Sequence, residues 1–244
     1  MSSSPLDNAP LGREVAYPAQ YDPSVLFAVN RKTNRAQLPF VPEWFGADIW
    51  HAYEVSWLNA KGKPLVAMAR FIVPHNSPNI IESKSFKLYL NSYNESRFNN
   101  ITEVQERLEE DLSGVAGAPV QVALTELHKI ETALCAPLEG ASIDNADIEI
   151  RHYQPNAGLL KCVANAQPVN ETLTSDLLKS NCPVTGQPDW GSLQIQYHGP
   201  QINRESLLKY IVSLRQHTEF HEHCVEKIYC DIWQACQPEF LFVY

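Results

Sequence analysis

The sequence predicts an α+β fold in which antiparallel strands pack against helices. Between residues 49 and 57 every second residue is large, and residues 64–73 form a plausible returning strand after the turn at 59–63. Residues 102–105 (Thr-Glu-Val-Gln) form a capping box ahead of a helical apolar pattern. Hairpins and helices follow one another without repeated strand–helix–strand units, which favours α+β over a doubly wound sheet. The sequence contains neither G-x-G-x-x-G nor a P-loop, so a Rossmann site is not predicted.

Residues 1–45 are predicted to be an extended N-terminal arm, since proline fixes φ and lacks an N–H donor. The prolines of this segment are Pro5, Pro10, Pro18, Pro23, Pro39 and Pro42. The polar stretch at 137–145 predicts a domain boundary. We therefore expect a first module over residues 46–140 and a second over 141–244.

In the first module, residues 79–90 look like a strand interrupted by four hydrogen-bonding side chains, Glu82-Ser83-Lys84-Ser85. This run is either a binding edge or the polar face of an edge strand. The helix that follows should end near 114–117, and residues 120–127 predict a further strand. The apolar face of the helix should hold Val104, Leu108, Leu112 and Val115.

In the second module, residues 148–153 alternate like a strand, 158–163 should pair with them, and 192–197 alternate again. Asn203 is predicted to cap one helix and Thr218 a second. The final apolar run, 239–244, predicts a strand. The two helices should bury Leu207, Leu208, Ile211 and Leu214, and Phe220, Cys224, Ile228 and Ile232, respectively.

Composition and charge restrict the class of protein. The chain has 244 residues, of which 44% are hydrophobic and 19% charged, as in globular proteins. Its net charge of −9 argues against a nucleic-acid surface. Neither a membrane-length apolar run nor a secretory signal is visible, so we expect a cytoplasmic protein. None of the six cysteines forms a C-x-x-C pair, and most should be reduced core residues.

The stretch 181–190 (Asn-Cys-Pro-Val-Thr-Gly-Gln-Pro-Asp-Trp) is the first candidate site. Its prolines and glycine predict a rigid turn-rich loop. A cysteine attacks an electrophile as thiolate, and a nearby carboxyl group can carry the proton. Cys182 and Asp189 are therefore candidates for nucleophile and proton carrier. The alternative is a surface loop with an unused thiol.

The second candidate is the histidine-rich run 216–223. His217 and His221 lie four residues apart, as zinc ligands on a helix do, but no H-E-x-x-H motif is present and the predicted cap at Thr218 separates them. A solvated first helical turn is a second interpretation. The third is a ligand site, in which Glu222 at a helix N-terminus accepts N–H groups from a flat heterocycle.

Together these motifs make the sequence resemble the NADPH-dependent 7-cyano-7-deazaguanine reductases, nitrile reductases of queuosine biosynthesis, in their longer two-module form. The matching segments are residues 81–92, the Cys182–Trp190 loop, and residues 215–222. The resemblance covers nearly the whole chain. It implies two tandem tunnelling-fold (T-fold) modules with antiparallel sheets and helices on one face, assembled as a homodimer.

The resemblance also implies roles for residues. Cys182 would add to the nitrile of 7-cyano-7-deazaguanine to form a thioimide, with Asp189 as proton-transfer partner and NADPH as reductant. Substrate-binding positions would be Ile81, Glu82, Ser83, His221 and Glu222, and NADPH-contacting positions would be Ser83 and Lys84. No metal is required, and neither nucleic acid nor membrane is an expected partner.

The family continues beyond the final strand with a basic segment, so we expect this chain to be truncated at Tyr244. Three alternatives remain open. The first is a zinc-dependent pterin or cyclohydrolase-type enzyme of the same fold. The second is a nitrile hydrolase that uses Cys182 and needs no NADPH. The third is a non-catalytic heterocycle-binding form that lacks the C-terminal segment.

Overall fold

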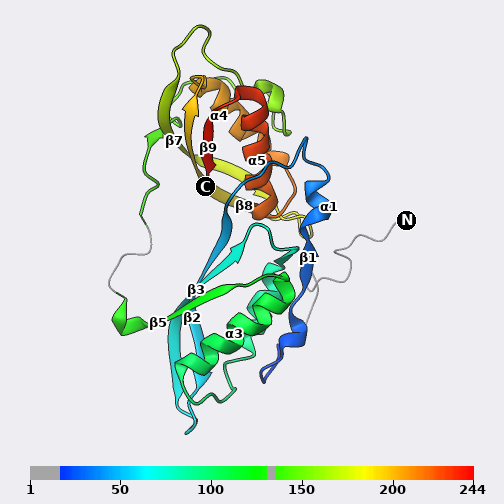
Figure 1. The fold of residues 1–244 in the computed structure, drawn as a ribbon, viewed down its shortest axis with the longest axis vertical. Coiled ribbons are helices and arrows are strands. Elements are labelled where there is room, and N and C mark those ends of the chain that lie inside the picture. Colours follow the sequence, from blue (N-terminus) through cyan, green and yellow to red (C-terminus); the bar gives the residue numbers. More distant parts are fainter. Residues whose placement is uncertain (1–16, 131–135) are drawn as a thin grey trace, which may run out of the picture. The chain divides into compact units, whose positions relative to one another are not determined.

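The computed structural model describes residues 17–130 and 136–244, so the predictions for residues 1–16 and for Cys135 lie outside the described residues. The chain divides into two compact units. Unit 1 comprises Met1–Ala36 and Glu43–Ala133, and unit 2 comprises Gln37–Pro42 and Leu134–Tyr244. Each unit combines helices with a mainly antiparallel sheet, which confirms the predicted α+β class (Figure 1).

Unit 1 is built on the predicted hairpin, β2 (Ala47–Leu58) and β3 (Pro64–Pro74). β5 (Gln121–Glu126) pairs antiparallel with β3, and α3 (Ile101–Ala116) packs along this sheet (Figure 1). A short 3₁₀ turn, η2 (Leu127–Lys129), follows β5. The buried core includes Val55, Trp57, Phe71, Val104, Leu108, Leu112 and Val122.

α3 begins earlier than the capping box predicted. Asn100, rather than Thr102, is the N-cap, and its Oδ1 accepts the Glu103 N–H at 2.9 Å. Glu103 reaches back to accept the Asn99 N–H at 2.7 Å, so a reciprocal cap forms two residues upstream. The helix ends at Gly117 with φ +73°, a conformation that glycine adopts readily.

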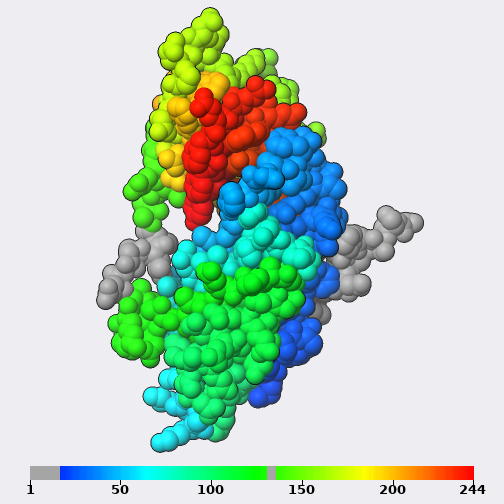
Figure 2. Space-filling view, in the orientation of Figure 1, coloured from blue at the N-terminus to red at the C-terminus, as the bar shows by residue number. Residues whose placement is uncertain are grey.

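The described part of the N-terminal arm carries regular structure that its prolines did not predict. It contains η1 (Pro23–Val25), β1 (Ala28–Asn30) and the short helix α1 (Arg31–Arg35). β1 pairs with β4 (Asn79–Ile81). Residues 17–30 of this arm lie against the rest of unit 1, dark blue against green in Figure 2. Tyr21 Oη, for example, donates to Asp111 Oδ2 at 2.6 Å.

The prediction of one interrupted strand over 79–90 is wrong. β4 ends at Ile81, and α2 (Ser83–Asn91) begins two residues later. The cause is Glu82, whose carboxylate accepts the N–H groups of Lys84 and Ser85 and so caps a helix.

Unit 2 repeats the order of unit 1. A hairpin of β7 (Val169–Asn181) and β8 (Pro188–Gly199) is followed by two helices, α4 (Arg204–Ser213) and α5 (His221–Cys236). β9 (Phe240–Val243), the predicted last strand, then pairs antiparallel with β8. The short β6 (Ala141–Ser142) pairs with β7, and η4 (Leu214–Gln216) extends α4.

Two strand predictions in unit 2 are wrong. Residues 148–153 lie outside helices and strands, and the region of 158–163 begins in η3 (Ala157–Leu159). β7 was not predicted because a register shift between Ser175 and Leu178 breaks its alternation. Serines also occupy two of its buried positions, Ser175 and Ser180. An apolar period of two is therefore absent from its sequence.

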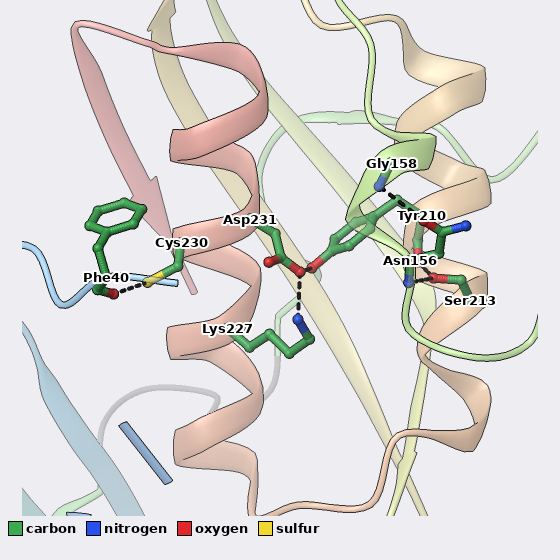
Figure 3. A network of polar contacts seen from close by, with 8 residues as sticks. All are labelled: Phe40, Asn156, Gly158, Tyr210, Ser213, Lys227, Cys230 and Asp231. Carbon is green, nitrogen blue, oxygen red and sulfur yellow. Dashed lines mark hydrogen bonds and ion pairs between the residues drawn. The ribbon is translucent and has the colours of Figure 1, made fainter. Parts of the chain in front are cut away.

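A buried polar network joins α4 to α5 (Figure 3). Tyr210 Oη donates to Asp231 Oδ2 at 2.7 Å, and Lys227 Nζ donates to the same oxygen at 2.9 Å. On the other side of α5, Cys230 Sγ donates to Phe40 O at 3.4 Å. Burial and the adjacent Asp231 carboxylate raise the pKa of Tyr210 well above its usual value, so the hydroxyl stays protonated.

Tyr210→Phe is expected to lower the free energy of unfolding by about 1–2 kcal/mol, because a buried carboxylate loses one of its donors. Chemical denaturation of the variant measures this loss. Tyr153→Phe, the same change at a tyrosine that is 45% exposed, is the matched control and should change stability by less than about 0.5 kcal/mol. Equal stability of the two variants would contradict a stabilising role for the network.

Candidate active site

Cys182 lies in the turn that joins β7 to β8. The turn is closed by two main-chain hydrogen bonds, from Cys182 N to Gln187 O at 2.9 Å and from Gly186 N to Cys182 O at 3.0 Å. Gly186 has φ +70°, which favours glycine. Cys182 is a free, partly exposed thiol. The geometry is a short closed turn that presents a thiol at the end of a hairpin.

The turn is shorter than the predicted irregular stretch 181–190. Asn181 is the last residue of β7, and Pro188 is the first residue of β8. A proline is tolerated at the first position of a strand, so it starts β8 instead of blocking it. Asp189 therefore lies on a strand, opposite Ser180, and not in a loop.

Asp189 and His221 lie side by side. Asp189 Oδ2 is 4.0 Å from His221 Nε2, and both side chains are partly exposed, at 41% and 55%. His221 is the first residue of α5, and Glu222 lies in the same first turn. The second unit thus carries Cys182 and Asp189 on one hairpin and brings His221, the first residue of α5, beside Asp189.

The predicted helix cap at Thr218 is wrong. Thr218 instead forms an isolated parallel bridge with Asn181, and the chain stays extended until Phe220, the N-cap residue. Phe220 offers no side-chain cap hydrogen bond. The chain is therefore still extended at Phe220, and His221 and Glu222 lie in the first turn of α5.

His217 and His221 do not share a helix face, because His217 precedes the helix. Burial lowers the pKa of His217. His223 is buried, with Nδ1 3.5 Å from Glu219 Oε2. Among the residues that the structure describes, no group of three His, Cys, Asp or Glu side chains is arranged to hold a metal ion.

Glu82 belongs to unit 1, and its side chain is fully buried there. Oε1 accepts the Lys84 N–H at 2.7 Å and Oε2 accepts the Ser85 N–H at 2.8 Å. Ile81 is also buried and pairs with Ala28 in the small β1–β4 sheet. A carboxylate has about four acceptor positions, so the two capping bonds leave acceptor capacity on Glu82.

Ser83 and Lys84 are half-buried and line a cavity of about 870 Å³ in unit 1. Its lining residues include Lys87, Trp50 and Phe86. Cations, a hydroxyl and flat apolar rings are the groups that a phosphorylated nucleotide would contact. The residues present therefore fit a cofactor such as NADPH.

Sequence reasoning assigned no role to the residues that connect the Cys182 hairpin to residues 215–217. The Arg215 guanidinium lies 5.1 Å from the ring centroid of Trp190, a cation–π contact between η4 and β8. Asn181 and Lys179 hydrogen-bond to main-chain atoms of the same segment. In the sequence, Asn181 could have been singled out by its position immediately before the candidate nucleophile Cys182.

Comparisons with known proteins agree on one family. The family model described as "Nitrile reductase, 7-cyano-7-deazaguanine-reductase N-term" matches residues 17–124, and that described as "QueF-like protein" matches residues 188–244. No helix in the described ranges is long and apolar enough to cross a bilayer.

Three relatives carry the name NADPH-dependent 7-cyano-7-deazaguanine reductase. The protein of Bordetella pertussis is 57% identical over 241 residues, that of Bordetella avium 54% over 246, and that of Burkholderia vietnamiensis 52% over 240. Each alignment covers 98% of this chain and 88% of the relative. With this identity over most of both sequences, the chain belongs to the NADPH-dependent 7-cyano-7-deazaguanine reductase family.

Proposed function

We propose that this chain reduces the nitrile of 7-cyano-7-deazaguanine to an aminomethyl group, a step in making the queuosine modification of tRNA in the cytoplasm. The observation that carries the proposal is the approach of Asp189 to His221, at 4.0 Å, on the hairpin whose turn holds Cys182. This arrangement lies in a chain that is 57% identical to a named reductase.

The proposed chemistry begins at Cys182. Its thiolate adds to the nitrile carbon, one C–N π bond becomes a lone pair on nitrogen, and Asp189 supplies the proton that this nitrogen needs. The product of this step is a covalent thioimide. NADPH, when bound, would supply two hydrides, one per molecule, which bring the carbon to the imine and then, with a proton taken up from water, to the amine level. The thiolate leaves after the first reduction.

We assign recognition of the heterocycle to two sets of residues. His221 and Glu222 lie at the N-terminus of α5, where a carboxylate is favoured. Ile81, Glu82 and Ser83 form the second set, in which the acceptor positions of Glu82 that remain after capping would receive N–H donors of the ring. Ser83 and Lys84 would contact NADPH from the cavity that they line.

We also propose two tandem T-fold modules, residues 46–140 and 141–244, behind an N-terminal arm at 1–45, in a homodimer. The repeated order of hairpin, two helices and a third strand supports the tandem modules. In both units that third strand pairs antiparallel with the second strand of the hairpin.

The stoichiometry of NADPH oxidation tests the function. With limiting 7-cyano-7-deazaguanine, two NADPH should be consumed per nitrile, and mass spectrometry should identify the aminomethyl product. Reactions without the nitrile control for background oxidation. Hydrolysis of the nitrile without NADPH consumption would contradict the proposal, as would substrate binding without turnover. Metal analysis that finds tightly held, stoichiometric zinc would favour a zinc-dependent enzyme instead.

A further inference from the structure

Asn181, the residue before Cys182, uses its main-chain N–H and C=O and its side-chain amide nitrogen to hold one neighbouring segment. Its N–H donates to His217 O at 2.8 Å, and its C=O accepts the Glu219 N–H at 3.1 Å. Its side-chain Nδ2 donates to Arg215 O at 3.2 Å and to His217 O at 3.1 Å. Four hydrogen bonds therefore tie one residue of β7 to residues 215–219.

Lys179 completes the arrangement. Its Nζ donates to Asn181 Oδ1 at 2.6 Å and to Arg215 O at 3.0 Å. Because an ammonium only donates and a carbonyl only accepts, these contacts determine the orientation of the Asn181 amide: Oδ1 must face Lys179, and Nδ2 must face the two carbonyls. We call Lys179 and Asn181 the amide clamp.

The amide clamp connects the two parts of the active site. Asn181 precedes Cys182 in the chain and pairs with Pro188, the neighbour of Asp189. The segment that it holds leads directly into α5, whose first residue is His221. Movement of Asn181 would therefore shift the thiol relative to the groups at the start of α5.

We propose that Asn181 and Lys179 are positioning residues for the reaction, which hold the Cys182 turn in register with the segment that carries His221. This inference rests on the proposed function, in which Cys182 is the nucleophile. Neither Lys179 nor Asn181 is assigned a contact with substrate or NADPH, so the expected effect of the clamp is on geometry. A displacement of about 1 Å at a reacting atom can slow a reaction on the order of 100-fold.

Asn181→Asp is the sharpest variant, because it keeps the size of the side chain and the acceptor for Lys179. It replaces the donor by a carboxylate oxygen that faces two carbonyl oxygens. Asn203→Asp is the matched control. Asn203 Oδ1 accepts the Ser206 N–H at 2.9 Å as the cap of α4, a role that aspartate fills equally well. Lys179→Met tests the second member of the clamp.

The experiment measures three quantities on the full chain. They are the rate of adduct formation between Cys182 and 7-cyano-7-deazaguanine without NADPH, the substrate Kd in a Cys182→Ala background, and the rate of Cys182 alkylation by iodoacetamide. Alkylation needs an accessible thiolate but no positioned partner. Thermal melting shows that each variant is folded.

For Asn181→Asp we expect adduct formation to slow by about 10-fold to 100-fold, while substrate Kd and alkylation rate change less than about 3-fold. Lys179→Met should show a smaller loss of the same kind, and Asn203→Asp should match the unsubstituted chain. An adduct rate within 3-fold of the unsubstituted chain would overturn the proposal. So would equal losses in adduct rate, binding and melting temperature, because these indicate general destabilisation. Failure of the unsubstituted chain to form any adduct would instead overturn the proposed function, and with it the role of the clamp in it.

Discussion

Cys182→Ala is expected to abolish nitrile reduction, with a loss of at least about 1,000-fold in kcat/KM. A nitrile accepts hydride poorly, and covalent addition of the thiolate converts it to a more reactive C=N group. Without the thiol, only binding and orientation of the reactants remain. NADPH oxidation in the presence of substrate measures the loss.

Cys162→Ala is the matched control for that experiment. Cys162 is also a partly exposed free cysteine of unit 2, but its Sγ contacts Cys236 O at 3.9 Å and lies on a different segment. This variant should retain turnover within about 3-fold of the unsubstituted chain, since Cys162 has no part in the reaction. Undiminished reduction by Cys182→Ala would refute covalent catalysis.

Asp189→Asn is expected to lower kcat by about 100-fold to 10,000-fold and to leave substrate Kd within about 3-fold, because the amide keeps the shape of the side chain but cannot carry the proton. Steady-state kinetics separate the two effects. Asp189 lies beside His221 and on the same hairpin as Cys182. We therefore expect the substitution to lower kcat without weakening substrate binding.

Asp176→Asn on strand β7 is the control for Asp189→Asn. Asp176 is an exposed carboxylate of the same hairpin, and the change removes the same charge from the same unit. Turnover should be unaffected. If Asp189→Asn lost binding and kcat in equal proportion, or lost neither, Asp189 would not be the proton carrier.

Local patterns in the sequence predicted the elements whose side chains follow a simple period. β3 and α4 alternate or repeat cleanly, and Asn203 caps α4 as expected. β2 was also predicted, although its register shifts between Ala52 and Val55, because large residues continue across the shift. Elements whose geometry depends on one local interaction were missed or misplaced. The register shift in β7 concealed a strand, and the capping carboxylate of Glu82 converted an apparent strand into a helix.

The spacing of residues in the sequence predicted only part of the candidate site. Cys182 and Asp189 lie seven residues apart in one motif, so they were found together. The proximity of Asp189 to His221 arises from pairing between Asn181 and Thr218, a long-range contact that no local pattern encodes. The same contact moved the start of α5 from the predicted cap to His221. Family resemblance, and not periodicity, supplied the chemical roles.

Intact-mass spectrometry of the chain mixed with 7-cyano-7-deazaguanine, without NADPH, tests the proposed thioimide most directly. The predicted result is a mass increase equal to one substrate molecule, mapped to Cys182, absent in Cys182→Ala and reversed when NADPH is added. A chain that reduces the nitrile with two NADPH but never carries this adduct at Cys182 would contradict the mechanism.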